Sequence, residues 1–186
     1  LVAALEEGDE TLPVVPVYIV SENRLLGAVY LTDEIRPEAA KTVTRLRQLG
    51  IKHVAMLTGD RRRTAELVAR AVGCDEVFAE LLPGQKVELV RRLQRGGRGV
   101  CMVGDGINDA PSLATATVGV AMGLRGTDVA IEAADAVLLR DDLTRVPLLI
   151  YLAKRTRTAI YQNLLFALVF AGLAEAAAAA GLFGPV

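Results

Sequence analysis

The sequence predicts an α/β fold, with a Rossmann-like core followed by a transmembrane helix. Between residues 39 and 139, short β-rich runs alternate with segments of helical periodicity. This alternation favours a parallel sheet with helices on both faces. The hydrophobic fraction of 52% is slightly above that of an average soluble protein, and the excess lies in the last quarter of the chain. That quarter therefore needs an explanation of its own.

Two β-rich runs precede the core. Residues 14–20 and 25–31 are joined by a polar segment, residues 21–24, and this pattern predicts a β-hairpin. A hairpin of this size is too small to be a domain by itself. After it, Asp33 is a candidate cap for the first helix of the core, and Gly50 is the expected end of that helix.

The elements of the core follow one another in regular alternation. Apolar runs typical of buried strands are separated by segments in which apolar residues recur at helical spacing. The carboxyl ends of such strands are where open α/β sheets bind ligands. The predicted strands are residues 53–57, 77–79, 99–103, 118–121 and 136–139, and the predicted helices are residues 39–49, 62–72, 84–94, 110–116 and 127–133.

A long helical pattern begins at residue 143 and continues into an apolar stretch, residues 164–186, whose only charged side chain is Glu175. A helix needs about 20 apolar residues to cross a bilayer. Lys154, Arg155 and Arg157 precede the stretch, and basic residues mark the cytoplasmic end of a span. We therefore expect a transmembrane helix entered from the cytoplasm. A buried or alanine-rich soluble helix is the alternative.

Composition excludes several classes of function. With 21 basic and 22 acidic residues, the net charge of -1 gives no electrostatic reason to expect a nucleic acid partner. Cys74 and Cys101 are too far apart in sequence for the usual zinc motifs. Cys101 lies in an apolar run, which predicts a small core residue. His53 is the only histidine and is interpreted as structural.

Polar residues follow two of the predicted strands in a way that suits a phosphoryl group. In Leu57-Thr58-Gly59-Asp60, a hydroxyl and a flexible backbone at a strand end could donate hydrogen bonds to phosphoryl oxygens. A plain turn before a helix would favour the same residue types. Lys86, at the start of a helix, could neutralise phosphoryl charge, although this segment taken alone favours a solvated surface lysine.

The segment from Val103 to Pro111 is more specific. It places Asp105, Asn108 and Asp109 in a glycine-containing loop directly after a buried strand. Two carboxylates and an amide so close together pack poorly in a core, but they supply the oxygen ligands that Mg²⁺ prefers. The loop is therefore a candidate magnesium site.

Taken together and in this order, the three segments resemble the phosphoryl-transfer site of the haloacid-dehalogenase superfamily, and specifically that of P-type ATPases. Residues 31–37, Leu-Thr-Asp-Glu-Ile-Arg-Pro, resemble the hinge between the nucleotide and phosphorylation domains of that family. Residues 56–60 resemble its second site motif. Residues 126–135 and the later Gln162-Asn163-Leu164 are similar to the heavy-metal class.

This resemblance implies a role for each matching residue, with ATP as substrate and Mg²⁺ as cofactor. The metal would be held by Asp105 with support from Asp109, and Asn108 would support metal and phosphate. Thr58 and Gly59 would contact the phosphoryl group, Lys86 would stabilise it, and Asp60 would help to couple the nucleotide to the site. The other implied partners are a heavy-metal cation and the lipid bilayer of a plasma membrane, with the phosphorylation domain in the cytoplasm.

The aspartate that is phosphorylated in this family lies in an Asp-Lys-Thr-Gly-Thr motif, and no Asp of this chain is followed by Lys-Thr. We therefore expect the nucleophile upstream of Leu1 and expect this chain alone to be inactive. Residues 1–32 would be a remnant of the nucleotide-binding domain, residues 33–145 part of the phosphorylation domain, and residues 146–186 a linker helix and a truncated transmembrane helix.

Three questions stay open at this level. Copper and zinc exporters are expected to carry Asn or Lys where this chain has Ala171, so the metal is undetermined. Glu175 lies about 16 Å along a helix from Leu164, near the expected middle of the bilayer, and could face an ion pathway or pair with a neighbouring helix. The alternatives to a pump are a soluble phosphatase of the same superfamily and a non-catalytic module that binds phosphate and Mg²⁺.

Overall fold

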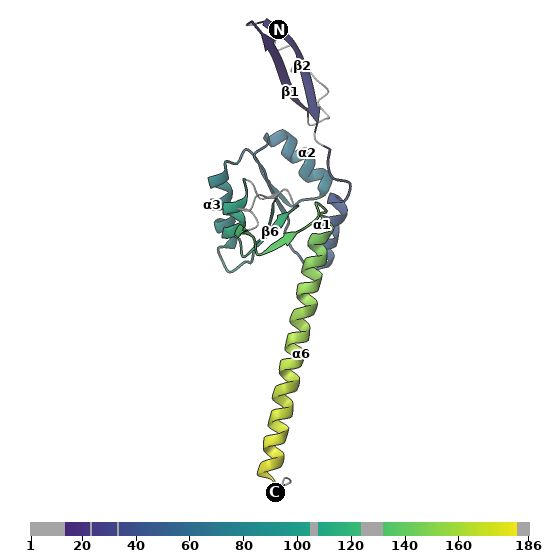
Figure 1. The fold of residues 1–186 in the computed structure, drawn as a ribbon, viewed down its shortest axis with the longest axis vertical. Helices are drawn as coiled ribbons and strands as arrows, with labels where there is room; N and C mark the ends of the chain where they lie inside the picture. The colour runs from purple at the N-terminus through teal and green to yellow at the C-terminus, as the bar shows by residue number, and fades with distance from the viewer. Residues whose placement is uncertain (1–13, 23, 33, 105–107, 124–131, 182–186) are drawn as a thin grey trace. The chain divides into compact units, whose positions relative to one another are not determined.

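The computed structural model describes residues 14–22, 24–32, 34–104, 108–123 and 132–181. The chain divides into two units, Leu1–Thr144 and Arg145–Val186, and its elements can be followed in chain order in Figure 1. Most of the predicted helix at residues 127–133 and most of the segment at residues 126–135 fall outside the described part of the chain, as does the end of the predicted span, residues 182–186.

The predicted hairpin is present. Strands β1 (Val14–Ser21) and β2 (Arg24–Thr32) pair antiparallel, with a shift in register between Ile19 and Val20. Apolar side chains of both strands are exposed, Val20 and Leu26 among them. A two-stranded hairpin with so much exposed apolar surface is marginal on its own. Its assignment to a nucleotide-binding domain stays a prediction.

The strands of the core are parallel, but they form two sheets and not the single sheet that the alternation suggested. One sheet pairs β3 (Ala55–Leu57) with β4 (Glu76–Phe78). The other has the order β5 (Cys101–Gly104), β6 (Val118–Met122), β7 (Ala136–Leu138). Within the described ranges, β3 and β5 are not hydrogen-bonded to each other. Alternation of strands and helices predicts that the strands are parallel and that helices cover the sheet. It does not determine which strands are neighbours.

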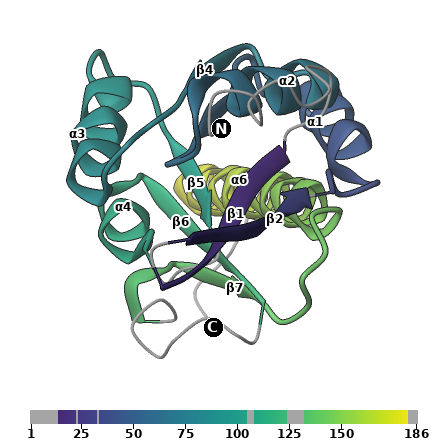
Figure 2. The same cartoon turned by 90° about the horizontal axis from the view of Figure 1, so that it is seen from above.

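Helices accompany these strands, and Figure 2 shows them around the two sheets. They are α1 (Ala39–Gln48), α2 (Arg62–Val72), α3 (Pro83–Gln94) and α4 (Ala110–Thr115). Helix α2 contacts α1 and β4, whereas α4 contacts α3, β5 and β6. Glu38, and not the predicted Asp33, precedes the first residue of α1. The predicted positions of these helices are otherwise confirmed to within two residues.

A small apolar core holds the two sheets together. Val90, Met102, Leu113 and Ala121 form a buried cluster, and Leu57 of β3 packs against it. The prediction that Cys101 is a core residue is wrong, because its side chain is exposed. It is the first residue of β5, and side chains alternate between the faces of a strand. Met102 takes the buried face, so Cys101 points the other way.

Asp75 links α1 to the first sheet. Its carboxylate accepts hydrogen bonds from Val54 N at 2.8 Å and from the Arg47 guanidinium at 2.7 Å. The backbone hydrogen bond from Val54 is the main reason that the pKa of Asp75 is lowered, and Arg47 adds to the effect. The interpretation of His53 as structural agrees with its contact to Glu76, whose carboxylate lies 3.1 Å from Nε2.

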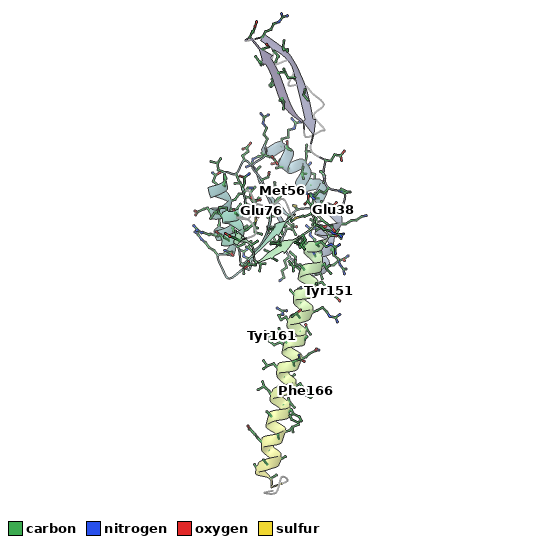
Figure 3. The ribbon with its side chains drawn as sticks, in the orientation of Figure 1. Glu38, Met56, Glu76, Tyr151, Tyr161 and Phe166 are labelled. Carbon is green, nitrogen blue, oxygen red and sulfur yellow. The ribbon has the colours of Figure 1, made fainter. Side chains whose placement is uncertain are left out.

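The second unit is one helix, α6 (Arg145–Ala179), which is long and apolar enough to cross a membrane by length and composition. Its aromatic side chains Tyr151, Tyr161 and Phe166 follow one another along the helix in Figure 3. The Arg155 guanidinium lies over the Tyr151 ring, 5.8 Å from its centroid, and donates a 3.0 Å hydrogen bond to the Tyr151 hydroxyl.

Helix α6 ends close to the last described residue. Gly181 has a φ of 73°, a left-handed conformation that glycine adopts readily at helix ends. Glu175 lies four residues before Ala179, the last residue of α6. Its expected position near the middle of the bilayer stays a prediction.

Candidate phosphoryl-transfer site

The first predicted segment follows β3 and forms a tight polar turn. The Thr58 hydroxyl donates a 2.6 Å hydrogen bond to the Asp60 carboxylate, and it accepts one from the Asp60 backbone N–H at 3.1 Å. The Thr58 N–H is bound to the Phe78 carbonyl of the neighbouring strand. Asp60 therefore sets the orientation of the hydroxyl that was expected to face a phosphoryl group.

Gly59 is not required by packing within the protein. A Cβ at this position would meet only the Leu81 carbonyl oxygen, at an ordinary contact distance of 3.5 Å. A side chain at position 59 would thus meet no clash at its Cβ within the described structure. This is compatible with a ligand that approaches the backbone closely.

The second segment positions Lys86 in the first turn of α3. Pro83 is suited to the start of a helix because its missing N–H would have no partner there. The Gln85 side chain accepts a 2.8 Å hydrogen bond from the Leu82 N–H and closes the turn. Lys86 follows directly, so the local sequence fixes where its side chain leaves the helix.

The Lys86 ammonium meets Asp109, which immediately precedes α4. Its Nζ lies 2.8 Å from Asp109 Oδ1, and the two side chains are only 13% and 14% exposed. Charged groups that are largely withdrawn from water are costly unless they are paired. The structure therefore joins the second and third predicted segments through one ion pair, which no local sequence pattern predicted.

Gly104, the last residue of β5, makes room for this pair. A Cβ on Gly104 would lie 2.7 Å from Asp109 Oδ2 and 2.9 Å from Asp109 Cβ. These distances are shorter than real Cβ contacts, so only glycine leaves space for the carboxylate. Sequence reasoning missed this requirement, and the glycine at the end of a buried strand was the signal for it.

The structure does not place every predicted site residue. Asn108 is exposed in the turn before α4. Asp105 lies outside the described residues, and no group of three metal-binding side chains occurs among those that are described. Leu57 packs against the cluster that contains Met102, so β3 and β5 border the same core. The described site residues form two polar groups. In one, Thr58 is hydrogen-bonded to Asp60. In the other, Lys86 is paired with Asp109.

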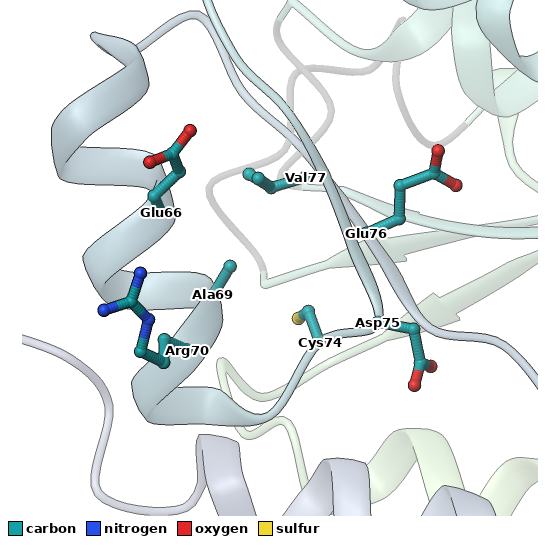
Figure 4. Close-up of a pocket in the computed structure, with 7 residues that line it drawn as sticks. All are labelled: Glu66, Ala69, Arg70, Cys74, Asp75, Glu76 and Val77. Atoms are coloured by element: carbon teal, nitrogen blue, oxygen red, sulfur yellow. The ribbon is translucent and has the colours of Figure 1, made fainter.

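A shallow hollow on the surface lies elsewhere. It is bounded by Glu66, Ala69 and Arg70 of α2 and by residues 74–77, as Figure 4 shows. Burial, followed by the negative charge of Asp75, raises the pKa of the Cys74 thiol, which favours the unreactive protonated form. None of the predicted site residues lines this hollow, so it is not the candidate site.

Comparison with known proteins shows the family of this chain. Residues 2–117 match the family model described as haloacid dehalogenase-like hydrolase. The match covers more than half of the chain, so the chain belongs to this family.

The relatives narrow the class to heavy-metal P-type ATPases. A copper-transporting ATPase 2 of Rhizobium meliloti is 48% identical over 92% of this chain and 20% of its own length. A manganese-exporting P-type ATPase of Mycobacterium bovis is 47% identical over 90% of this chain and 22% of its own length. The chain thus spans about a fifth of these relatives.

A solved structure extends the likeness along nearly the whole chain. The crystal structure of a zinc-transporting PIB-type ATPase in the E2.Pi state has a TM-score of 0.82 and 40% identity. The match covers 98% of this chain and 30% of the chain in that crystal structure. The chain therefore resembles pumps whose names state three different metals.

Proposed function

We propose that this chain is the magnesium-binding and phosphoryl-stabilising part of a P-type ATPase that moves a heavy-metal cation across a membrane. The observation that carries this proposal is the Lys86–Asp109 ion pair, which is largely withdrawn from water at the end of β5. An ammonium held in this way is suited to stabilise the charge of a transferring phosphoryl group, because it needs no rearrangement during the reaction.

The side chains around this pair suit Mg²⁺. The Asp109 carboxylate and the Asn108 amide follow β5 and offer oxygen ligands, and Asp105 of the same loop would complete the set. Asp105 and Asp109 would hold the ion, which when bound would neutralise phosphoryl charge and orient the phosphate. Thr58 would turn its hydroxyl proton from Asp60, which accepts it in this structure, to a phosphoryl oxygen. Lys86 would balance the negative charge of the phosphoryl group.

The covalent step needs an aspartate that this chain does not supply. In the proposed reaction, a carboxylate oxygen attacks the γ-phosphorus of ATP, the bond to ADP breaks, and an acyl phosphate forms. Such an aspartate would follow a strand at the same edge of the sheet. Within the described residues, β3 and β5 are unpaired with each other although both contact the same core. This arrangement supports a further parallel strand between β3 and β5, and that strand would carry the acceptor aspartate.

The membrane part of the proposal rests on α6. Its apolar length supports a span, and its cluster of basic residues supports an orientation with the catalytic unit in the cytoplasm. A soluble phosphatase would not need this helix. We infer a heavy-metal cation as cargo and leave the metal open, because the relatives differ in the metal that they are named for and Ala171 matches neither expected residue.

Replacing Asp105 by Ala tests the magnesium role. The protein to use is a full-length pump carrying this sequence, either the complete reading frame or a chimera in which this chain replaces the matching segment of a relative. We expect Asp105→Ala to reduce phosphoenzyme formation from labelled ATP at least about 100-fold, because a ligand of the charge-neutralising ion is lost. Glu88→Ala, an exposed carboxylate of α3, is the matched control. Equal phosphoenzyme in both variants would contradict the assignment.

A further inference from the structure

Arg36 and Asp141 form an ion pair between residues that are 105 positions apart in the sequence. Arg36 Nη2 lies 2.8 Å from Asp141 Oδ2, and Nη1 donates a 3.3 Å hydrogen bond to the Asp141 backbone carbonyl. One guanidinium thus holds both the side chain and the main chain of the same residue. This double contact restricts orientation more than a single bond would.

The pair joins two irregular segments. Arg36 lies in the linker between β2 and α1, and its carbonyl accepts a 3.0 Å hydrogen bond from the Ala39 N–H. Asp141 lies in the loop between β7 and α6. These are the segments by which the chain enters the core after the hairpin and leaves it before the long helix.

Stability alone does not explain this arrangement. The two side chains are 45% and 60% exposed, and an exposed ion pair contributes only ~0–1 kcal/mol. The hydrogen bond to Asp141 is the main reason that the pKa of Arg36 is raised. A double contact that adds little to folding stability is suited to fixing the direction of a linker.

We propose that Arg36 and Asp141 are positioning residues that hold the linker from the hairpin against the β7–α6 loop, and that phosphorylation by ATP depends on this contact. The inference rests on the proposed function. In the proposed pump, the linker leads through the hairpin to the nucleotide-binding domain. That domain must bring ATP to the core. Inorganic phosphate needs no such delivery, because the acceptor carboxylate can attack it directly with loss of water. Loss of the Arg36–Asp141 pair should therefore slow phosphorylation by ATP but not phosphorylation by inorganic phosphate.

The test compares the two donors in the full-length pump. Arg36→Ala and Asp141→Ala are each expected to lower the rate of phosphorylation by labelled ATP about tenfold, in line with the sensitivity of such reactions to positioning. Phosphorylation by labelled inorganic phosphate should stay within about twofold of the unmodified pump. The exchanged pair, Arg36→Asp with Asp141→Arg, should recover part of the ATP reaction, whereas Arg36→Asp alone should not.

Arg47→Ala is the matched control. Arg47 is also an exposed arginine, 46% accessible, and it pairs with Asp75 at 2.7 Å, but this pair ties α1 to the segment before β4. Its loss should affect both donors equally. Equal losses with both donors in the Arg36 and Asp141 variants, or no loss with either, would overturn the positioning role. An unmodified pump that forms no phosphoenzyme from either donor would instead overturn the proposed function.

Discussion

Replacing Lys86 by Ala in the full-length pump is expected to slow phosphoenzyme formation from ATP by about 10²–10³-fold, the usual effect of removing one preorganised charge-stabilising group. The ammonium is held 2.8 Å from Asp109 and is largely withdrawn from water. Its loss removes the positive charge and leaves the Asp109 carboxylate without this partner. The rate of label incorporation after rapid mixing with ATP measures the effect.

Two further substitutions make this result specific. Lys41→Ala removes an exposed lysine of α1 and should leave the rate unchanged. Lys86→Arg keeps the charge but cannot reproduce the geometry of a compact ammonium, so an intermediate rate is expected. If Lys86→Ala and Lys41→Ala behaved alike, the Lys86–Asp109 pair would be a structural contact only.

Replacing Gly119 by Ala is expected to destabilise the first unit, Leu1–Thr144, by about 1–3 kcal/mol, as overpacking of a filled core does. The new Cβ would lie 2.6 Å from the Leu113 carbonyl oxygen and 3.0 Å from its carbonyl carbon. These are backbone atoms of a residue whose side chain is fully buried, so they cannot move aside easily. Gly119 also exchanges hydrogen bonds with Asp135, which a backbone shift would strain.

Unfolding of this chain in mild detergent, followed by circular dichroism against denaturant, measures the loss. Gly84→Ala is the control, because a Cβ at Gly84 meets no atom within 4 Å and alanine is favoured over glycine in a helix. We expect unchanged or slightly higher stability for Gly84→Ala. A Gly119→Ala variant as stable as Gly84→Ala would show that β6 and α4 are less closely packed than described.

The elements of the core were predictable because their signals are local. Helix α2 spans Arg62–Val72 as predicted, since apolar spacing and a glycine at its end determine it. Pairing between distant segments was not predictable. The separation of β3 from β5, the Lys86–Asp109 contact and the Arg36–Asp141 contact all depend on how loops bring remote residues together.

One misinterpretation has a simple physical origin. The apolar run around Cys101 indicated burial, but strand alternation turned this one side chain outward. The residue types of Lys86 and Asp109 singled them out in the sequence, whereas their contact with each other required the structure.

The most direct test of the account is the transfer of label from γ-labelled ATP to protein in the presence of Mg²⁺, measured as acid-stable phosphoprotein. The full-length pump should be labelled, and the label should be released by hydroxylamine, as an acyl phosphate requires. This chain alone should remain unlabelled, because it supplies Lys86, Asp109 and the proposed Asp105 site but no acceptor aspartate. A stable, hydroxylamine-sensitive phosphoprotein formed by this chain alone would contradict the account.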